Sequence, residues 1–220
     1  IFISSNSLKK FVILCLAIKQ NSQRVPKKNF RIFRGSPLYK YVLRKYSDHS
    51  VYVDTDSDQI IKECQIDPTL RHVKAYKREL GLRGDTISVC DLLLNFIDKF
   101  DINDPIVQTH VTSPFMNVGI LEDAYGYLHK YDSVVSCNVH NSRFWRKESY
   151  GYCPINHNPL KLEQTQDLPK LYEENSAFYI FRPEVLKKTG NRIGENPFFY
   201  SINHPHNLDI DTESDWRMVT

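Results

Sequence analysis

The feature that most constrains the fold is a run of eight apolar residues, Phe11 to Ile18, which ends in a polar and basic stretch. An unbroken apolar run of this length, bounded by turn residues, is typical of a strand buried on both faces of a parallel sheet. In open α/β sheets, ligands bind just beyond the carboxyl ends of such strands. The residues after Ile18 that suit a polyanion are Lys19, Ser22, Arg24, Lys27, Lys28 and Asn29. On charge alone, a solvated basic loop after a core strand is an equal alternative.

The remainder of the chain alternates between short β-type runs and stretches with a helical apolar face. The helical patterns cover residues 37–45, 59–64, 86–100, 118–130 and 183–189, with a further helix starting at Thr212. The β-type runs cover residues 51–53, 105–111, 133–137, 175–181 and 198–202. This alternation predicts an α/β fold, and 220 residues suit a single domain with a full core.

The basic residues are unevenly distributed. Residues 9–45 contain eleven Lys and Arg and no acid, although the net charge of the chain is only +3. Such a basic segment can indicate nucleic-acid binding, but here it is arranged around one loop, so we expect a nucleotide ligand and no nucleic acid. No apolar run approaches the roughly 20 residues of a membrane span, and the five scattered cysteines lack metal-type spacing. We therefore expect a cytoplasmic protein with reduced thiols and no membrane partner.

The segment from Ala17 to Asn29, AIKQNSQRVPKKN, resembles the nucleotide-binding loop of the acylneuraminate cytidylyltransferases, the CMP-sialic acid synthetases. The matching positions are Gln20, Asn21, Ser22, Arg24, Pro26, Lys28 and Asn29. Lys19 stands where the family usually has arginine, and lysine lacks the planar fork that grips phosphate bidentately. The resemblance implies a three-layer, Rossmann-like nucleotidyltransferase fold with a mainly parallel central sheet. It further implies one cytidylyltransferase domain over residues 8–220.

Two further segments resemble the family at its nucleotide and sugar sites. Arg78 and Asp85 match a family segment that lies beside the cytosine, although Asp85 is equally explained as the cap of the following helix. Thr112 and Ser113 match the family's T-S-P sequence after a strand. The resemblance implies that either Gln108 or His110 takes the role of the family glutamine that faces the sugar.

A D-T-D sequence, Asp54 to Asp56, follows the β-type run over residues 51–53. Two readings are open. The pair of aspartates can bind a metal ion, as in nucleotide-sugar glycosyltransferases, or it can form a turn and cap the next helix, which is the commoner role of Asp at such a position. The first reading makes a metal-dependent glycosyltransferase an alternative function.

The C-terminal sequence LDIDTESDW is similar to a family segment of the form I-D-I-D-T-x-x-D-(F/L). Asp209 and Asp211 are two residues apart, so both carboxylates face the same way in an extended segment. Thr212 and Asp215 form a capping-box pattern, which leaves Asp209 and Asp211 available for Mg²⁺, an ion that prefers carboxylate oxygen. Asn175 matches a family asparagine at a strand entrance, and we expect it at the sugar site.

Residues 139–174 lack clear periodicity and are rich in polar and aromatic side chains. The resemblance implies that they form an arm that packs on a second subunit, which predicts a two-fold homodimer; a mobile surface insert is the alternative. Thr165 and Glu173 stand where arm arginines of the family meet the sugar carboxylate. We therefore expect a different or modified acidic nine-carbon sugar as the acceptor.

Taken together, these residues imply transfer of CMP from CTP to a sialic-acid-like sugar, with pyrophosphate as the second product. In this reading Lys19, Lys28 and Asp211 act in catalysis, and Asp209 and Asp211 bind Mg²⁺. The nucleotide-binding set is Lys19, Asn21, Ser22, Arg24, Lys28, Asn29, Arg78, Asp85, Thr112 and Ser113. A catalytically inactive nucleotide-binding homologue is the remaining alternative.

Overall fold

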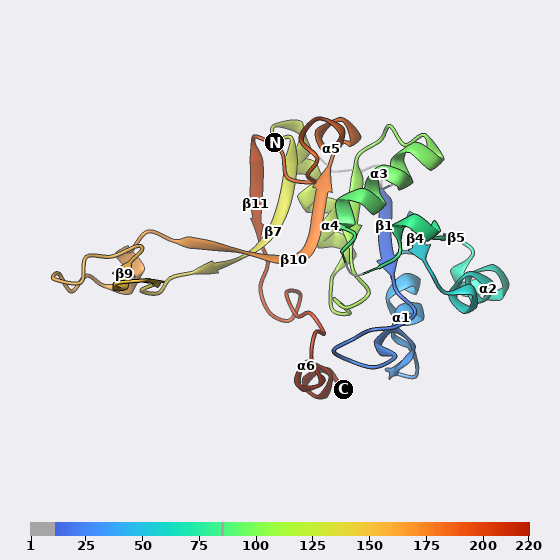
Figure 1. The fold of residues 1–220 in the computed structure, drawn as a ribbon, viewed down its shortest axis with the longest axis horizontal. Coiled ribbons are helices and arrows are strands. Elements are labelled where there is room, and N and C mark those ends of the chain that lie inside the picture. The colour runs from blue at the N-terminus through green and yellow to red at the C-terminus, as the bar shows by residue number, and fades with distance from the viewer. Residues whose placement is uncertain (1–11, 85) are drawn as a thin grey trace, which may run out of the picture.

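The computed structural model describes residues 12–84 and 86–220 (Figure 1). Its centre is a seven-stranded sheet in the order β11-β7-β10-β6-β1-β4-β5. The strands are β1 (Ile13–Ile18), β4 (Ser50–Thr55), β5 (Val73–Lys77), β6 (Ile106–Thr109), β7 (Ser133–His140), β10 (Leu171–Phe181) and β11 (Pro197–Ser201). Strand β10 pairs antiparallel with both β6 and β7, and the other pairs of this sheet are parallel. The predicted mainly parallel sheet is confirmed.

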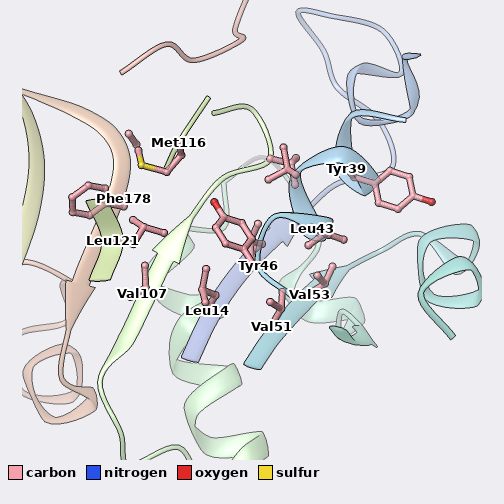
Figure 2. Close-up of a cluster of buried hydrophobic side chains, with 14 of the residues drawn as sticks. Leu14, Tyr39, Leu43, Tyr46, Val51, Val53, Val107, Met116, Leu121 and Phe178 are labelled. Atoms are coloured by element: carbon pink, nitrogen blue, oxygen red, sulfur yellow. The ribbon is translucent and has the colours of Figure 1, made fainter. Parts of the chain in front are cut away.

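Helices cover both faces of this sheet. They are α1 (Leu38–Arg44), α2 (Asp58–Ile66), α3 (Val89–Phe100), α4 (Val118–Gly126) and α5 (Pro183–Thr189), while α6 (Glu213–Val219) lies beyond one end of the strands (Figure 1). On one face, Leu14 of β1 shares a cluster with Leu43 of α1 and Leu121 of α4 (Figure 2). On the other, Cys15 shares a cluster with Phe96 of α3 and Leu186 of α5. Because successive residues of β1 point to opposite faces, its apolar run fills both clusters, which gives the three-layer architecture.

The predicted helix over residues 86–100 begins later than its pattern indicated. Helix α3 starts at Val89, and Ser88 is its N-cap. The Ser88 hydroxyl accepts a hydrogen bond from the Asp91 amide at 3.1 Å, and an Asp91 carboxylate oxygen accepts one from the Ser88 amide at 3.1 Å. This capping box satisfies two backbone donors, so Ser88 is the N-cap of the helix. Asp85 itself lies outside the described residues.

Two other helix boundaries differ from the patterns. The helix predicted over residues 118–130 is α4 followed by a 3₁₀ turn, Tyr127–His129. Pro37, expected inside the first helix, instead ends a two-stranded ribbon formed by β2 (Ile32–Phe33) and β3 (Ser36–Pro37). The final helix α6 has the predicted capping box of Thr212 and Asp215.

The segment 139–174 extends far from the sheet (Figure 1). Strands β7 and β10 continue past the sheet as a pair, with Leu171 opposite His140, and lead to a hairpin of β8 (Trp145–Glu148) and β9 (Gly151–Pro154). Large apolar side chains are exposed along it: Trp145, Tyr150, Tyr152, Leu160, Leu162 and Tyr172. We refer to residues 139–174 as the arm.

The cysteine side chains all lie within the described residues. All five cysteines are free, and Cys15, Cys64 and Cys137 are buried. Within residues 12–84 and 86–220, the structure contains no helix with the length and apolar character needed to cross a bilayer.

Candidate active site

The loop that follows β1 folds back on itself at the carboxyl edge of the sheet. The Asn29 side-chain amide donates to the Lys19 carbonyl at 2.7 Å, which closes the loop. The Gln20 amide donates to an Asp56 carboxylate oxygen at 2.7 Å and joins the end of β1 to the end of β4. Lys27 has a left-handed backbone with φ of 54° just before a short 3₁₀ turn, Lys28–Phe30. We refer to residues 19–31 as the basic loop.

A cavity of about 260 Å³ opens beside the basic loop. It brings together six of the predicted site residues, namely Lys19, Lys28, Asn29, Arg78, His110 and Thr112. A second hollow of about 210 Å³ shares Lys19 and Lys28 with it and is also lined by Asn21, Ser22 and Arg24. The two hollows share Lys19 and Lys28, and together they are lined by the predicted nucleotide-binding residues of the basic loop.

The two ends of the chain meet at this region. Asp211 Oδ1 lies 3.1 Å from Arg24 Nη2 and 3.6 Å from Lys28 Nζ. Lys28 also donates to the Ile210 carbonyl at 2.5 Å, and the Ile210 amide donates to the Thr112 carbonyl at 2.9 Å. Asp211 is thus held beside the cations of the basic loop, and Asp209 lies two residues before it in the same segment.

Helix α6 holds the C-terminal segment in place. Asp215 accepts a hydrogen bond from the Asp211 amide at 3.0 Å, in addition to its capping-box bonds with Thr212. Arg31 forms a bidentate pair with Glu213 at 2.6 and 2.7 Å, and its guanidinium lies 5.3 Å from the ring centroid of Trp216. Bidentate Arg–carboxylate pairs fix orientation as well as position. Arg31 therefore couples the position of Asp211 to the basic loop.

We expect the Arg31→Met variant to loosen this attachment without unfolding the domain, because the pair is peripheral to both core clusters. Hydrogen–deuterium exchange of the α6 amides should be faster than in the wild type, while exchange in β1 and β6 should be unchanged. Lys188→Met is the matched control, since Lys188 also pairs with a carboxylate, Glu195, but on an exposed surface. Equal exchange of α6 in wild type and Arg31→Met would show that the pair does not hold the helix.

Asp209 has an unusual environment for a carboxylate. Its Oδ1 is buried and forms no hydrogen bond within the described residues. Burial raises the pKa of Asp209, and the neighbouring Asp211 charge adds to this, while Thr112 and Lys28 oppose it. A carboxylate oxygen with no donor, two residues from a second carboxylate, is suited to a cation.

The chemistry of Asp209 and Asp211 suits Mg²⁺. Within residues 12–84 and 86–220, His, Cys, Asp and Glu side chains form no cluster of three or more that would hold a metal by itself. Mg²⁺ does not need one, because it usually keeps several waters and is bound by one or two carboxylates together with substrate phosphates. The unpartnered Oδ1 of Asp209 and the adjacent Asp211 therefore fit a magnesium ion that is shared with a triphosphate.

Asp54 and Asp56 are engaged elsewhere. Asp54 is 1% exposed and forms a buried ion pair with Arg78, which is 2% exposed. Arg78 also donates to the Asp54 carbonyl at 3.2 Å. Burial raises the pKa of Asp54, and the Arg78 charge opposes this. With Asp54 paired and Asp56 bonded to the basic loop, the arrangement favours a structural role for the D-T-D sequence over the metal-binding reading.

The candidate sugar residues Gln108 and His110 form one hydrogen-bonded unit. Gln108 is buried, and its Nε2 lies 2.8 Å from His110 Nε2, so it is the His110 ring that lines the cavity. The Gln108 Oε1 accepts a hydrogen bond from Arg192 at 2.6 Å. Sequence reasoning missed Arg192, because it lies 84 residues from Gln108 and no local pattern marks it.

Asn175 lies in a second cluster, with two asparagines that the sequence reading also missed. The Asn175 amide donates to Asn138 Oδ1 at 3.0 Å, and the Asn207 amide donates to the same oxygen at 2.9 Å. Asn138 in turn donates to Glu173 at 3.0 Å. Hydrogen bonds from Asn138 and His140 lower the pKa of Glu173. The base of the arm is therefore connected to the segment that carries Asp209.

Comparisons with known proteins identify the family to which this chain is similar. The family model described as cytidylyltransferase matches residues 19–218. N-acylneuraminate cytidylyltransferase A of Danio rerio is 30% identical over 208 residues, which cover 90% of this chain and 47% of that protein. N-acylneuraminate cytidylyltransferase of Streptococcus agalactiae serotype V is 25% identical over 218 residues, covering 94% and 52%. The chain thus spans about half the length of the curated relatives it matches.

Solved structures share the fold at low sequence identity. CMP:2-keto-3-deoxy-manno-octonic acid synthetase complexed with CTP superposes with a TM-score of 0.65 at 15% identity, over 95% of this chain and 96% of that chain. A 4-diphosphocytidyl-2C-methyl-D-erythritol synthase superposes with a TM-score of 0.64 at 12% identity, over 96% and 98%. At these identities the likeness establishes the three-layer architecture alone.

Proposed function

The chain belongs to the cytidylyltransferase family, and from this premise we propose that it transfers CMP from CTP to a sialic-acid-like, nonulosonic sugar and releases pyrophosphate. The observation that carries the proposal is the contact of Asp211 with Arg24 and Lys28. It unites a cationic loop, suited to a triphosphate, with a carboxylate pair suited to Mg²⁺. The names of the curated relatives support the substrate class.

In this proposal the cations of the basic loop bind the nucleotide through its phosphates. Lys19, Arg24 and Lys28 neutralise the charge that develops on the departing pyrophosphate, which is the main demand of phosphoryl and nucleotidyl transfer. Asn21, Ser22 and Asn29 add hydrogen bonds, and the Asn29 Oδ1 is buried and unpartnered within the described residues. Mg²⁺ held by Asp209 and Asp211 would supply Lewis acidity at the α-phosphate and lower the pKa of the acceptor hydroxyl.

The wall of the cavity forms the base and acceptor region of the proposed site. Arg78 is proposed to contribute to the site as part of the cavity wall, because its charge is already paired with Asp54. Thr112 and Ser113 lie in the turn after β6 that anchors the Asp209 segment. His110, Gln108 and Asn175 are proposed to position the sugar. Asp85 remains a proposed nucleotide residue and lies outside the described residues.

The acceptor is proposed to be a different or modified acidic nine-carbon sugar. Thr165 and Glu173 stand in place of the arginines that the family resemblance implies for the sugar carboxylate. Glu173 is bonded to Asn138 and His140 at the base of the arm, and His140 Nε2 lies 2.6 Å from it. A carboxylate held at that place would repel an acidic group directed toward it.

We further propose a two-fold homodimer formed by the arm. The arm carries exposed large apolar side chains, including Trp145, Tyr152 and Leu160, and exposed apolar surface can mark protein–protein contacts. The domain is proposed to cover residues 8–220, with residues 139–174 as the arm. A cytoplasmic location is proposed from the five free cysteines.

The function is tested by measuring pyrophosphate release from CTP and Mg²⁺ with a panel of nonulosonic acids. We expect release with at least one acidic nine-carbon sugar, faster than with N-acetylneuraminate, and a CMP-sugar product in equal amount. Equal or better turnover of N-acetylneuraminate would contradict the altered acceptor. CTP binding without pyrophosphate from any sugar would indicate an inactive homologue, and transfer from a nucleotide sugar without pyrophosphate would indicate a glycosyltransferase.

A further inference from the structure

A line of three hydrogen-bonded side chains, Arg192, Gln108 and His110, leads to the cavity. Gln108 of β6 lies opposite Tyr179 of β10 in the antiparallel register. The Arg192 guanidinium carbon lies 3.5 Å from the ring centroid of Tyr179, and Arg192 Nη1 donates to Gln108 Oε1 at 2.6 Å. Gln108 Nε2 lies 2.8 Å from Nε2 of His110, whose ring lines the cavity.

The chemistry of these groups permits one arrangement of protons. A guanidinium has only donors, so the Gln108 atom that faces Arg192 must be the amide oxygen. The amide nitrogen therefore faces His110, and because an amide nitrogen only donates, His110 Nε2 must accept. The proton of a neutral ring is then on Nδ1. No described residue forms a hydrogen bond to that nitrogen.

The surroundings keep Arg192 directed at Gln108. Its guanidinium stacks on the Tyr179 ring, and no carboxylate within the described residues lies at ion-pair distance from it. The Tyr179 hydroxyl is itself held, by Glu174 and by Ser176. Arg192 is therefore placed by a rigid ring, and its hydrogen bond to Gln108 has no competing anion.

The charges around His110 favour the neutral ring. Burial, with the Arg192 and Lys28 charges, lowers the pKa of His110 to about 4, against an opposing effect of Asp211. A ring protonated on both nitrogens would place two donors face to face at the Gln108 contact. The electrostatics and the hydrogen-bond geometry therefore both favour a neutral His110 ring.

We propose that Arg192 is a positioning residue: through Gln108 it locks His110 in the Nδ1–H tautomer, so that the ring presents a hydrogen-bond donor to an oxygen of the bound substrates. In this arrangement His110 has no free lone pair and is not the general base. The role of His110 toward a substrate rests on the proposed function. The tautomer itself is a property of the unliganded protein, so it can be measured whether or not the protein turns over a substrate.

The direct test is nitrogen-15 NMR of histidine-labelled protein without substrate at pH 7, with the His110 signals assigned from the His110→Gln spectrum. We expect a protonated Nδ1 and an unprotonated Nε2 in the wild type. The Arg192→Met variant should lose this preference, because the Gln108 amide can then flip and accept from Nε2–H. Arg192→Lys, which keeps a donor, should retain at least part of it. Lys188→Met, which removes an exposed cation in the last turn of α5, is the control and should resemble the wild type.

A protonated Nε2 in the wild type, or an unchanged tautomer in Arg192→Met, would overturn the inference. With whichever sugar releases pyrophosphate, we expect kcat/KM to fall about 10-fold in Arg192→Met, the size of one lost hydrogen bond, and to recover in part in Arg192→Lys. If no sugar is turned over, the proposed function fails while the tautomer result still decides this inference. An unchanged kcat/KM beside a changed tautomer would also count against the donor role.

Discussion

Replacing Lys28 with methionine is expected to lower the rate of pyrophosphate release by about 10²–10³-fold, the usual cost of removing one preorganised group that stabilises transition-state charge. Lys28 lines both hollows of the site, and its side chain is only 12% exposed. It is also the cation that touches both the Ile210 carbonyl and Asp211. No other described side chain joins the basic loop to the late aspartates through two contacts of this kind.

The measurement is kcat and KM for CTP in the pyrophosphate assay, at fixed Mg²⁺ and saturating sugar. The loss should appear mainly in kcat, because the charge on the leaving group grows toward the transition state. Lys188→Met is the control, as a lysine of equal size in an exposed ion pair with Glu195. If kcat of Lys28→Met decreases by less than 10-fold while circular dichroism shows an intact fold, Lys28 does not have the proposed catalytic role.

Replacing Asp54 with asparagine is expected to lower the free energy of unfolding by about 3–5 kcal/mol, because it leaves the buried Arg78 charge without its partner. Both side chains are 2% exposed or less, so water cannot compensate for the lost carboxylate. Asp58→Asn is the matched control. Asp58 also pairs with a cation, Lys77, but it is 88% exposed, and such pairs contribute at most about 1 kcal/mol.

Urea unfolding at one fixed protein concentration measures the difference, since any dimer would make stability depend on concentration. The double variant Asp54→Leu, Arg78→Met removes both charges and should recover much of the loss. A cost of Asp54→Asn no greater than that of Asp58→Asn would mean that Asp54 is not a structural partner of Arg78. The metal-binding reading of the D-T-D sequence would then have to be restored.

Local patterns predict most of the fold because each carries its own physical cause. The apolar run of β1 has to be buried on both faces, and Thr212 with Asp215 satisfies backbone donors at the start of α6. The first residue of α3 was predicted too early, because the apolar face of a helical pattern does not show which residue supplies the cap. Ser88 does so here, three residues past Asp85.

The convergence of Lys28 and Asp211 was predicted through a family resemblance, and spacing alone does not contain it, since 182 residues separate Lys28 from the Ile210 carbonyl that it binds. Contacts without a family motif were missed for the same reason. Arg192 reaches Gln108 from the loop after α5, and Asn207 reaches Asn138 from the C-terminal segment. Such contacts depend on how the strands are arranged in the sheet, and this arrangement cannot be predicted from a short stretch of sequence.

The most direct test of the central claim is a crystal structure with CTP and Mn²⁺, in which anomalous scattering locates the metal. The account predicts one manganese peak in contact with the carboxylates of Asp209 and Asp211, and triphosphate oxygens within hydrogen-bond distance of Lys28 Nζ. A metal bound at Asp54 and Asp56, or a triphosphate bound away from the basic loop, would contradict it.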